Sequence, residues 1–527
     1  MAENYKLDSN STGLRIAEEA SVKTLPGTPI WIPYEPNGYN DFGGQVTTVA
    51  RNPINANRKR KKGVLTDLDA SGGFPTDVTQ TNMQDVLQGF FFADLRKKGE
   101  CKNPIGETTI TISVANTNSR FTRVGGSVDL SAQFAVGDLV FSSGFSNSAN
   151  NGLFKVSAVT TTTLDVVTAD GTESAVTLVD ESATSDGSLV DVGFESAQGD
   201  VDVDMTGSRP ALTSTSLDFT DLGLVVGEFI FIGGDETATK FATAANNGFA
   251  RVRSIAADRL EFDKTASTMV TEANTTLYVQ IFFGRVIKDE TGTNIVRRSY
   301  QLERILGKAD TTDTYDQAEY ITGAIPNEFM LHIPTADKVT AELNFVGMDH
   351  ETKDGDTGPK SGTRPTLVES NAFNTSSDFS RIKLAVHSET DANPTKLFAF
   401  ASDINITINN GITPNKAISV LGAFDATQGN FEVGGDITAY FADVASIEAI
   451  RANANVTLDM HMVKSNAGIS IDLPLITLGD GRLEVEQDQA IPIPLSKEAA
   501  TGAAIDTNMD HTMLMVFFDY LPDLADV

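Results

Sequence analysis

The sequence predicts a mainly β protein with two β-barrel or β-sandwich domains, each flanked by an α-helix, and two small antiparallel β-modules inserted into the first domain. Three observations predict this fold class. Apolar residues make up 40% of the 527 residues, which is enough to bury several cores. Long segments alternate between apolar and polar residues, as strands do. Finally, the chain contains two internal repeats, which indicate duplicated units.

The clearer repeat lies between residues 106 and 276. The segment GDLVF at 137–141 resembles GEFIF at 227–231, and ANNG at 149–152 recurs at 245–248. Asn-Gly between apolar residues is typical of a two-residue hairpin turn, since both turn positions need positive φ. We therefore expect two copies of one small antiparallel module, with hairpin turns at Asn151, Gly152, Asn247 and Gly248.

A fainter repeat joins the two ends of the chain. At an offset of 358 residues, Ile54, Asn57, Asp67, Asp85 and Val86 recur as Ile412, Asn415, Asp425, Asp443 and Val444. A helix is predicted at the same place in each copy. The first covers 82–98, with Thr81 as N-cap and Gly99 at its end, and the second covers 443–454, with Asp443 as N-cap and Val444 facing inward. We interpret the repeat as a duplicated strand–helix unit.

These patterns divide the chain into six predicted parts. They are an N-terminal arm (1–24), the first part of domain 1 (25–105, with an arm or hairpin at 38–74), module 1 (106–195), module 2 (196–276), the second part of domain 1 (277–370) and domain 2 (371–527). Strands are predicted at 278–283, 329–333, 339–346 and 513–518, where apolar residues are dense or alternate.

Composition and charge exclude several classes of protein. The 71 acidic and 40 basic residues give a net charge of −31, which argues against tight binding of nucleic acid. Cys101 is the only cysteine, so an intrachain disulfide and a Cys-based zinc site are excluded. The N-terminus lacks the pattern of a signal peptide, and the most apolar stretch, 222–232, is short and contains Glu228. We expect no membrane association and folding in a reducing cytoplasm.

The sequence shows no catalytic signature. It lacks a Gly-x-Ser-x-Gly elbow, a phosphate loop and a His-Glu-x-x-His motif. Asp200, Asp202 and Asp204 share one face of a predicted strand, but a solvated strand face explains them better than a calcium site does. We therefore predict a protein that is not an enzyme and that carries no metal or cofactor.

The strongest local feature is a run of five cations in this acidic chain, Arg58, Lys59, Arg60, Lys61 and Lys62. Three interpretations stay open: a solvated charge run, contact with acidic groups of another copy, or contact with nucleic acid. Contact with another copy is the interpretation that we favour.

Several segments resemble the major tail tube proteins of long-tailed bacteriophages. In the N-terminal part they are QVTTVARNPI (45–54), the basic run and TDLDASGGF (66–74). In the C-terminal part they are ITPNK (412–416), LGAFD (421–425), FEVGG (431–435), AYFAD (439–443), DGR (480–482) and EQDQ (486–489). These short motifs are spread over nearly the whole chain.

The resemblance implies tail-tube-type domains and a structural virion protein, assembled in the host bacterial cytoplasm. Such proteins form stacked rings through which DNA passes at infection. The expected partners are other copies, the tape measure and terminator proteins, and double-stranded DNA that is not held tightly. External modules favour a sheathless, siphophage-type tail. For inter-subunit assembly the candidate residues are Arg51, the basic run Arg58, Lys59, Arg60, Lys61 and Lys62, and then Asp67, Asp69 and Phe74.

The resemblance also implies rings that are built from six tube domains. If each chain supplies two of these domains, three chains make a ring with near-sixfold symmetry. A homohexamer is the alternative. Two other functions are alternatives on the sequence alone. One is a surface adhesin or carbohydrate-binding protein built from β-modules, and the other is a virion-associated hydrolase that uses a carboxylate pair.

Overall fold

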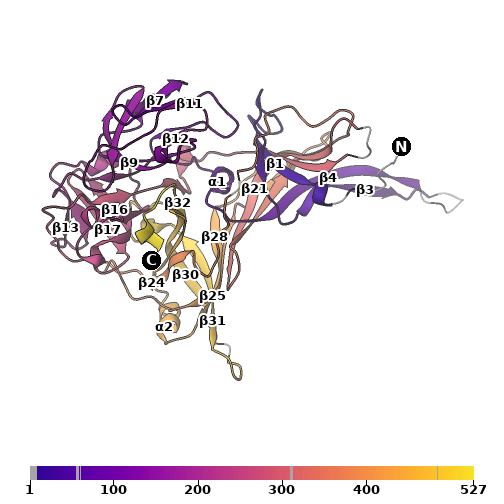
Figure 1. The fold of residues 1–527 in the computed structure, drawn as a ribbon. Coiled ribbons are helices and arrows are strands. Elements are labelled where there is room, and N and C mark those ends of the chain that lie inside the picture. The colour runs from indigo at the N-terminus through magenta and orange to yellow at the C-terminus, as the bar shows by residue number, and fades with distance from the viewer. Residues whose placement is uncertain are drawn as a thin grey trace.

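The computed structural model describes residues 7, 9–54, 59, 61–308, 313–368, 370–483 and 485–526. Its strands form antiparallel sheets of 16, 14 and 2 strands, and its two α-helices are short (Figure 1). The mainly β prediction is therefore confirmed. No sheet of the described residues closes on itself, so the sandwich alternative describes this chain better than the barrel alternative.

Two groups of five strands in the 16-stranded sheet share one order of pairing. The first unit consists of β1 (Gly13–Glu18), β20 (Tyr300–Gly307), β21 (Gln317–Pro334), β22 (Thr340–Gly347) and β4 (Lys61–Asp77). The second unit consists of β24 (Phe379–Val386), β29 (Val456–Lys464), β30 (Ala467–Asp480), β31 (Pro492–Ala500) and β28 (Glu432–Tyr440).

A helix occupies the same place in both units. In the first unit α1 (Gln84–Phe91) follows β4 and packs against β21. In the second unit α2 (Ala445–Arg451) follows β28 and packs against β30. Chain order, strand pairing and helix contact therefore repeat together, which is the pattern that duplication of a strand–helix unit produces.

Strand β25 (Ala401–Asn409) joins the two units. One of its edges pairs with β21 of the first unit, as in Phe329 with Ile408, and the other pairs with β28 of the second unit. One hydrophobic cluster runs through both units, from Leu14 to Phe517. The two predicted tube domains thus share a core within this chain.

The remaining strands of this sheet lie at its margins. They are β2 (Ile32–Tyr34) beside β1, β3 (Asn40–Arg51) beside β4, β23 (Asp349–Lys353) beside β21, and the pair β19 (Arg285–Lys288) and β32 (Leu514–Phe518) beside β30. The two-stranded sheet is β26 (Thr413–Lys416) with β27 (Ala423–Thr427). All four predicted strands of the C-terminal part are present, within β18, β21, β22 and β32.

The first helix is shorter than predicted. It ends at Phe91 because Phe92 adopts a left-handed conformation with φ 48°, so Gly99 is not its cap. Thr81 does not cap the start either. Its hydroxyl lies 3.1 Å from the hydroxyl of Ser370, and the helix begins after Met83 without a side-chain cap.

The second helix starts one residue later than predicted. Its N-cap residue is Val444 and not Asp443, and no side chain caps it. The Asp443 carboxylate nevertheless accepts a hydrogen bond from the backbone amide of Ala445 at 2.5 Å. The helix ends at Arg451, however, and Val444 is 57% exposed rather than turned inward. A half-buried Ile447 and Ile450 hold the helix against the core instead.

The 14-stranded sheet holds the inserted region, between α1 and β20. Its first part contains β5 (Glu100–Cys101), β6 (Thr111–Ala115), β7 (Arg120–Gly125), β8 (Asp138–Ser143), β9 (Gly152–Val159), β10 (Thr163–Thr168), β11 (Glu181–Thr184) and β12 (Ser188–Glu195). Its second part contains β13 (Asp202–Asp204), β14 (Ala211–Thr213), β15 (Phe229–Ile232), β16 (Gly248–Ala256) and β17 (Arg259–Thr265). Strand β18 (Gln280–Phe282) pairs with both β12 and β15 and so joins the parts.

The Asn-Gly pairs do not form the predicted two-residue turns. Asn151 and Asn247 are extended, with φ −107° at both, and only the glycines, Gly152 and Gly248, have positive φ. Each asparagine side chain instead closes a longer loop through hydrogen bonds to the backbone. The Asn151 amide group bonds both the N–H and C=O of Phe145, and Asn247 does the same at Phe241.

The two loops share further hydrogen bonds. The preceding asparagines, Asn150 and Asn246, are buried and donate to the carboxylates of Glu181 and Glu272, at 3.0 Å and 2.8 Å. The repeated ANNG motif is therefore a loop-closing device, because both side-chain amides satisfy backbone groups that the loop leaves unpaired.

We predict that Asn151→Ala and Asn247→Ala each lower the free energy of unfolding by about 1–3 kcal/mol, since each removes bonds to partly buried backbone groups. Asn116, which is exposed, provides the control, and Asn116→Ala should cost less than about 0.5 kcal/mol. Denaturant unfolding of the full chain measures all three variants. Equal losses of unfolding free energy in the three would contradict the loop-closing role of Asn151 and Asn247.

Candidate assembly surfaces

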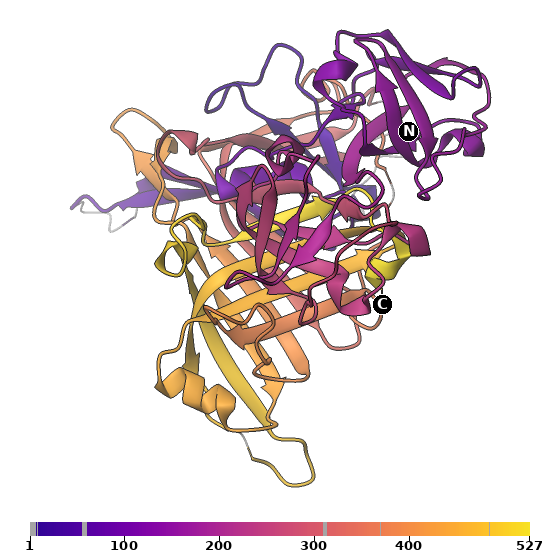
Figure 2. The same cartoon turned by 90° about the vertical axis from the view of Figure 1, so that its left-hand side faces the viewer.

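A long hairpin projects from the first unit (Figures 1 and 2). Residues 45–51 of β3 and 61–69 of β4 pair with each other and extend past β22, whose pairing with β4 stops at Ala70. We call this projecting part the arm. Its large apolar side chains are exposed, among them Val46 (57%), Val49 (56%) and Val64 (52%). A neighbouring chain could bury them, which is what an assembly arm requires.

The arm carries the basic side chains at its far end. Arg51, Lys59, Lys61 and Lys62 are exposed there, whereas Arg58 and Arg60 lie outside the described residues. The prediction that this run contacts another copy therefore stays a prediction.

Two of the candidate acids bind a cation within the chain. The Lys416 ammonium of β26 lies 2.5 Å from a carboxylate oxygen of Asp67 and 2.5 Å from one of Asp69. The hydrogen bond from Lys416 lowers the pKa of Asp67, and both carboxylates raise the pKa of Lys416. This contact joins the β26–β27 hairpin, which precedes β28 of the second unit in the chain, to the arm of the first unit.

Phe74 has a different environment from the other candidates. Its ring is fully buried and lies between Tyr34 and Phe345, with ring centroids 5.8 Å and 6.5 Å away. The packing of this side chain is thus satisfied by its own chain, at the base of the arm.

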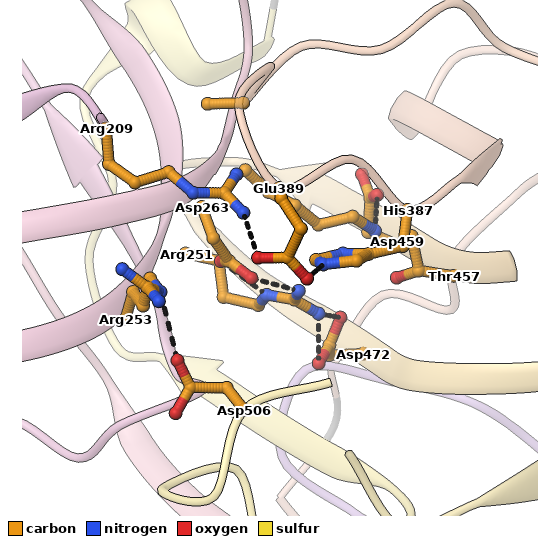
Figure 3. Close-up of polar contacts among 12 residues, drawn as sticks. Arg209, Arg251, Arg253, Asp263, His387, Glu389, Thr457, Asp459, Asp472 and Asp506 are labelled. Atoms are coloured by element: carbon orange, nitrogen blue, oxygen red, sulfur yellow. Dashed lines mark hydrogen bonds and ion pairs between the residues drawn. The ribbon is translucent and has the colours of Figure 1, made fainter. Parts of the chain in front are cut away.

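A buried ionic cluster connects the inserted region to the second unit (Figure 3). Arg251 of β16 is fully buried between two carboxylates. It binds Asp263 of β17 through two hydrogen bonds of 2.9 Å and 2.5 Å, and it binds Asp472 of β30 at 2.9 Å and 3.0 Å. Because Asp472 lies in another sheet, this guanidinium bridges the two sheets.

Further charge pairs surround this bridge. Lys264 of β17 binds Asp459 of β29, and Arg381 of β24 lies 2.6 Å from the same carboxylate. Burial alone raises the pKa of Asp459, but Lys264 and Arg381 bring it well below its ordinary value. At the edge of the cluster Arg253 binds Asp506 at 2.9 Å. The cations come mainly from module 2 and the carboxylates mainly from the second unit.

Sequence reasoning missed this cluster, although a signal existed. Asp459 and Asp472 are single acids inside strands that are otherwise apolar or neutral, VTLDMHMV and GISIDLPL. A charge in a buried strand needs an opposite charge, and the cations Arg251 and Lys264 lie in strands of module 2. The pairing partner, however, is set by the fold.

The three aspartates that were weighed as a calcium site separate in the structure. Asp200 accepts hydrogen bonds from residues 214–216, Asp202 from the amide of Asn274, and Asp204 from Arg259 and Thr206. In the part of the chain that the structure describes, no group of three or more His, Cys, Asp or Glu side chains is arranged to hold a metal ion. Nor does any described helix have the length and apolar character that a membrane span needs.

The family model described as phage tail tube protein matches residues 253–499. Within this region the chain is similar to phage tail tube proteins. The matched region begins in β16, contains β20 to β22 of the first unit and ends in β31 of the second. No curated protein matches the chain.

An aromatic contact lies beside the buried ionic cluster. His461 of β29 is fully buried, stacks on Phe249 at 4.1 Å between ring centroids, and meets Phe229 edge-on at 4.6 Å. Its Nδ1 atom lies 2.7 Å from the hydroxyl of Ser470. Burial lowers the pKa of His461 to about 3, so the ring is neutral near pH 7.

We predict that replacing Arg251 is strongly destabilising. Arg251→Met leaves two buried carboxylates without their cation, which costs about 3–5 kcal/mol. Arg253 is the matched control because its side chain is 29% exposed, and Arg253→Met should cost less than about 1 kcal/mol. Chemical denaturation compares the two, and similar small costs would show that the bridge contributes little.

A second prediction concerns pH. An unfolded histidine has a pKa of about 6.5, whereas folded His461 has a pKa of about 3, so between these values the unfolded state binds the extra proton. This residue's contribution to stability is complete above pH 6.5 and falls by up to about 1.4 kcal/mol per pH unit on acidification. His461→Leu should therefore flatten the dependence of unfolding free energy on pH between 6.5 and 4. An unchanged slope would exclude this histidine as the cause.

Proposed function

We propose that this chain is a phage tail tube protein and that it self-assembles into stacked rings, which form the tube through which phage DNA is ejected. The observation that carries the proposal is the match to the tail tube family together with the repeated five-strand unit. The arm, with its exposed apolar and basic side chains, is the surface that meets another copy. The protein acts as a virion component, without catalysis, and is assembled in the host cytoplasm beside other tail proteins.

Each ring contains three chains in this proposal. Because both units have the same pairing order and helix position, each can occupy one of six equivalent places around the axis. A heterologous contact that closes after six units gives threefold symmetry with a near-sixfold interior. Each chain carries one pair of modules for its two units, so the exterior is threefold.

The contact between the two units of one chain serves as a template for the contact between chains. Within the chain, Lys416 of the second unit binds Asp67 and Asp69 of the first. At the offset of 358 residues, Arg58 corresponds to Lys416 and Asp425 corresponds to Asp67. The basic run of one chain therefore meets the β26–β27 hairpin of the next, with Asp425 among its partners.

The charge of the chain suits a conduit for DNA. A lumen that displays few cations offers phosphates no replacement for their counterions, so DNA slides without being held. The net charge of −31 provides such a surface.

Electron microscopy of the purified protein tests this function. We expect tubes or stacked rings with three exterior lobes per ring when no symmetry is imposed during averaging. Six equal exterior lobes per ring, in which each of six chains contributes one unit, would support the homohexamer instead. Isolated monomers at all concentrations would contradict assembly.

Charge reversal of the basic run gives a second test. Lys59→Glu, Lys61→Glu and Lys62→Glu together should abolish tube formation, because like charges in an interface cost several kcal/mol. The monomer should keep its melting temperature, since these side chains are exposed. Lys97→Glu, at an exposed cation outside the arm, is the control and should assemble normally. Normal tubes from the triple variant would refute the role of the run.

A further inference from the structure

The two units differ at one strand edge. In the first unit the outer edge of β1 is covered by β2, with Leu14 opposite Tyr34. In the second unit β24 holds the place of β1, and among the described residues its strand pairing is with β29 alone. The chain around Lys396 covers only the end of β24, where the Leu397 amide bonds the carbonyl of Leu384. The edge at residues 379–383 stays open.

A groove of about 1130 Å³ runs along this open edge. All five residues from Phe379 to Lys383 line it. Because successive residues of a strand point to opposite faces of the sheet, a cavity lined by all five follows the edge of the strand. Its opposite walls come from module 2 and from the segment 393–401. Phe400, which is 74% exposed, offers an apolar contact at its rim. The groove thus has the volume and the lining that an added segment needs.

The charge of the groove is opposite to that of the chain. Four cations line it, Lys240, Arg381, Lys383 and Lys396, and the described lining residues include no carboxylate. Arg381 is paired with the buried Asp459 at 2.6 Å, so the three lysines supply the charge for a ligand. Burial, and then repulsion from Arg381, lowers the pKa of Lys383 to about 8. An anionic occupant would relieve that repulsion. In a chain of net charge −31, such a groove favours an acidic ligand.

One exposed segment of the chain has the matching chemistry. The loop at 481–490, between β30 and β31, reads GRLEVEQDQA, with acids that alternate with apolar or neutral residues. Val485 is 70% exposed, and Glu486 and Asp488 are exposed too. The loop lies at the end of a projecting hairpin (Figure 2). None of the loop residues that the structure describes lines the groove of its own chain. It is therefore available to another copy.

We propose that the groove along β24 binds residues 481–490 of a second copy, which add to the open edge as an extended segment. Backbone hydrogen bonds to β24 supply the pairing, Val485 packs near Phe400, and the acids face the groove cations. The inference rests on the proposed self-assembly and names a contact that the assembly uses in addition to the arm.

Cysteine cross-linking in assembled tubes tests the contact. Cys101, the only native cysteine, is buried, so the double variant Val485→Cys with Phe400→Cys reports on the new pair alone. We expect a ladder of covalent oligomers on oxidation. The matched control pairs Val485→Cys with Ile418→Cys, which is also highly exposed (97%), and should give no ladder. Tubes that form without a ladder from the first pair, or with equal ladders from both, would overturn the contact while leaving the proposed function intact.

A peptide experiment tests the groove without assembly. The peptide GRLEVEQDQA, titrated onto the full-length unassembled protein, should bind, and binding should weaken at high salt. Lys240→Glu with Lys396→Glu, or a peptide with its three acids replaced by amides, should weaken binding at least tenfold. Absence of binding to the unmodified protein, or equal binding in all cases, would refute the groove even if tubes form.

Discussion

Unpaired strand edges are the constraint on which this structure depends. Each edge exposes N–H and C=O groups that must find partners, and a chain of many strands has many edges. Here β25 fills the space between β21 and β28 and thereby turns two units into one sheet. Strand β18 does the same between the two inserted modules. Edges that no strand of the chain covers are the natural places for other copies.

Charge determines how the sheets sit against each other. Hydrophobic contact alone has no direction, whereas Arg251 accepts only a geometry in which Asp263 and Asp472 both reach it. A buried ion pair adds little net stability because desolvation offsets attraction. Its effect here is on orientation, since a rotation of module 2 would take Arg251 away from Asp472 and Lys264 away from Asp459.

Much of the fold could be predicted from local patterns. Alternation of apolar residues located β21, β22 and β32, and the sequence repeat at 358 residues anticipated a repeat in strand pairing. Helix ends were predicted less well, because the left-handed Phe92 follows from packing and not from a cap motif. The repeat of the ANNG motif was predicted, but the predicted two-residue turn was wrong. The hydrogen-bond partners of the asparagine side chains lie four to six residues away in the loop. The ionic joint depends on strands that the sequence separates widely, and no local pattern pairs them.

That separation has a consequence for how the chain folds. Arg251 and Asp472 are 221 residues apart, and Arg251 is synthesised first. Module 2 can form its own core early, but its cations have no partner until β29 and β30 emerge from the ribosome. Docking of the module on the second unit is thus a late, long-range step, whose loop-closure entropy makes it slow. The contact between module 2 and the second unit therefore forms only after β30 has been synthesised.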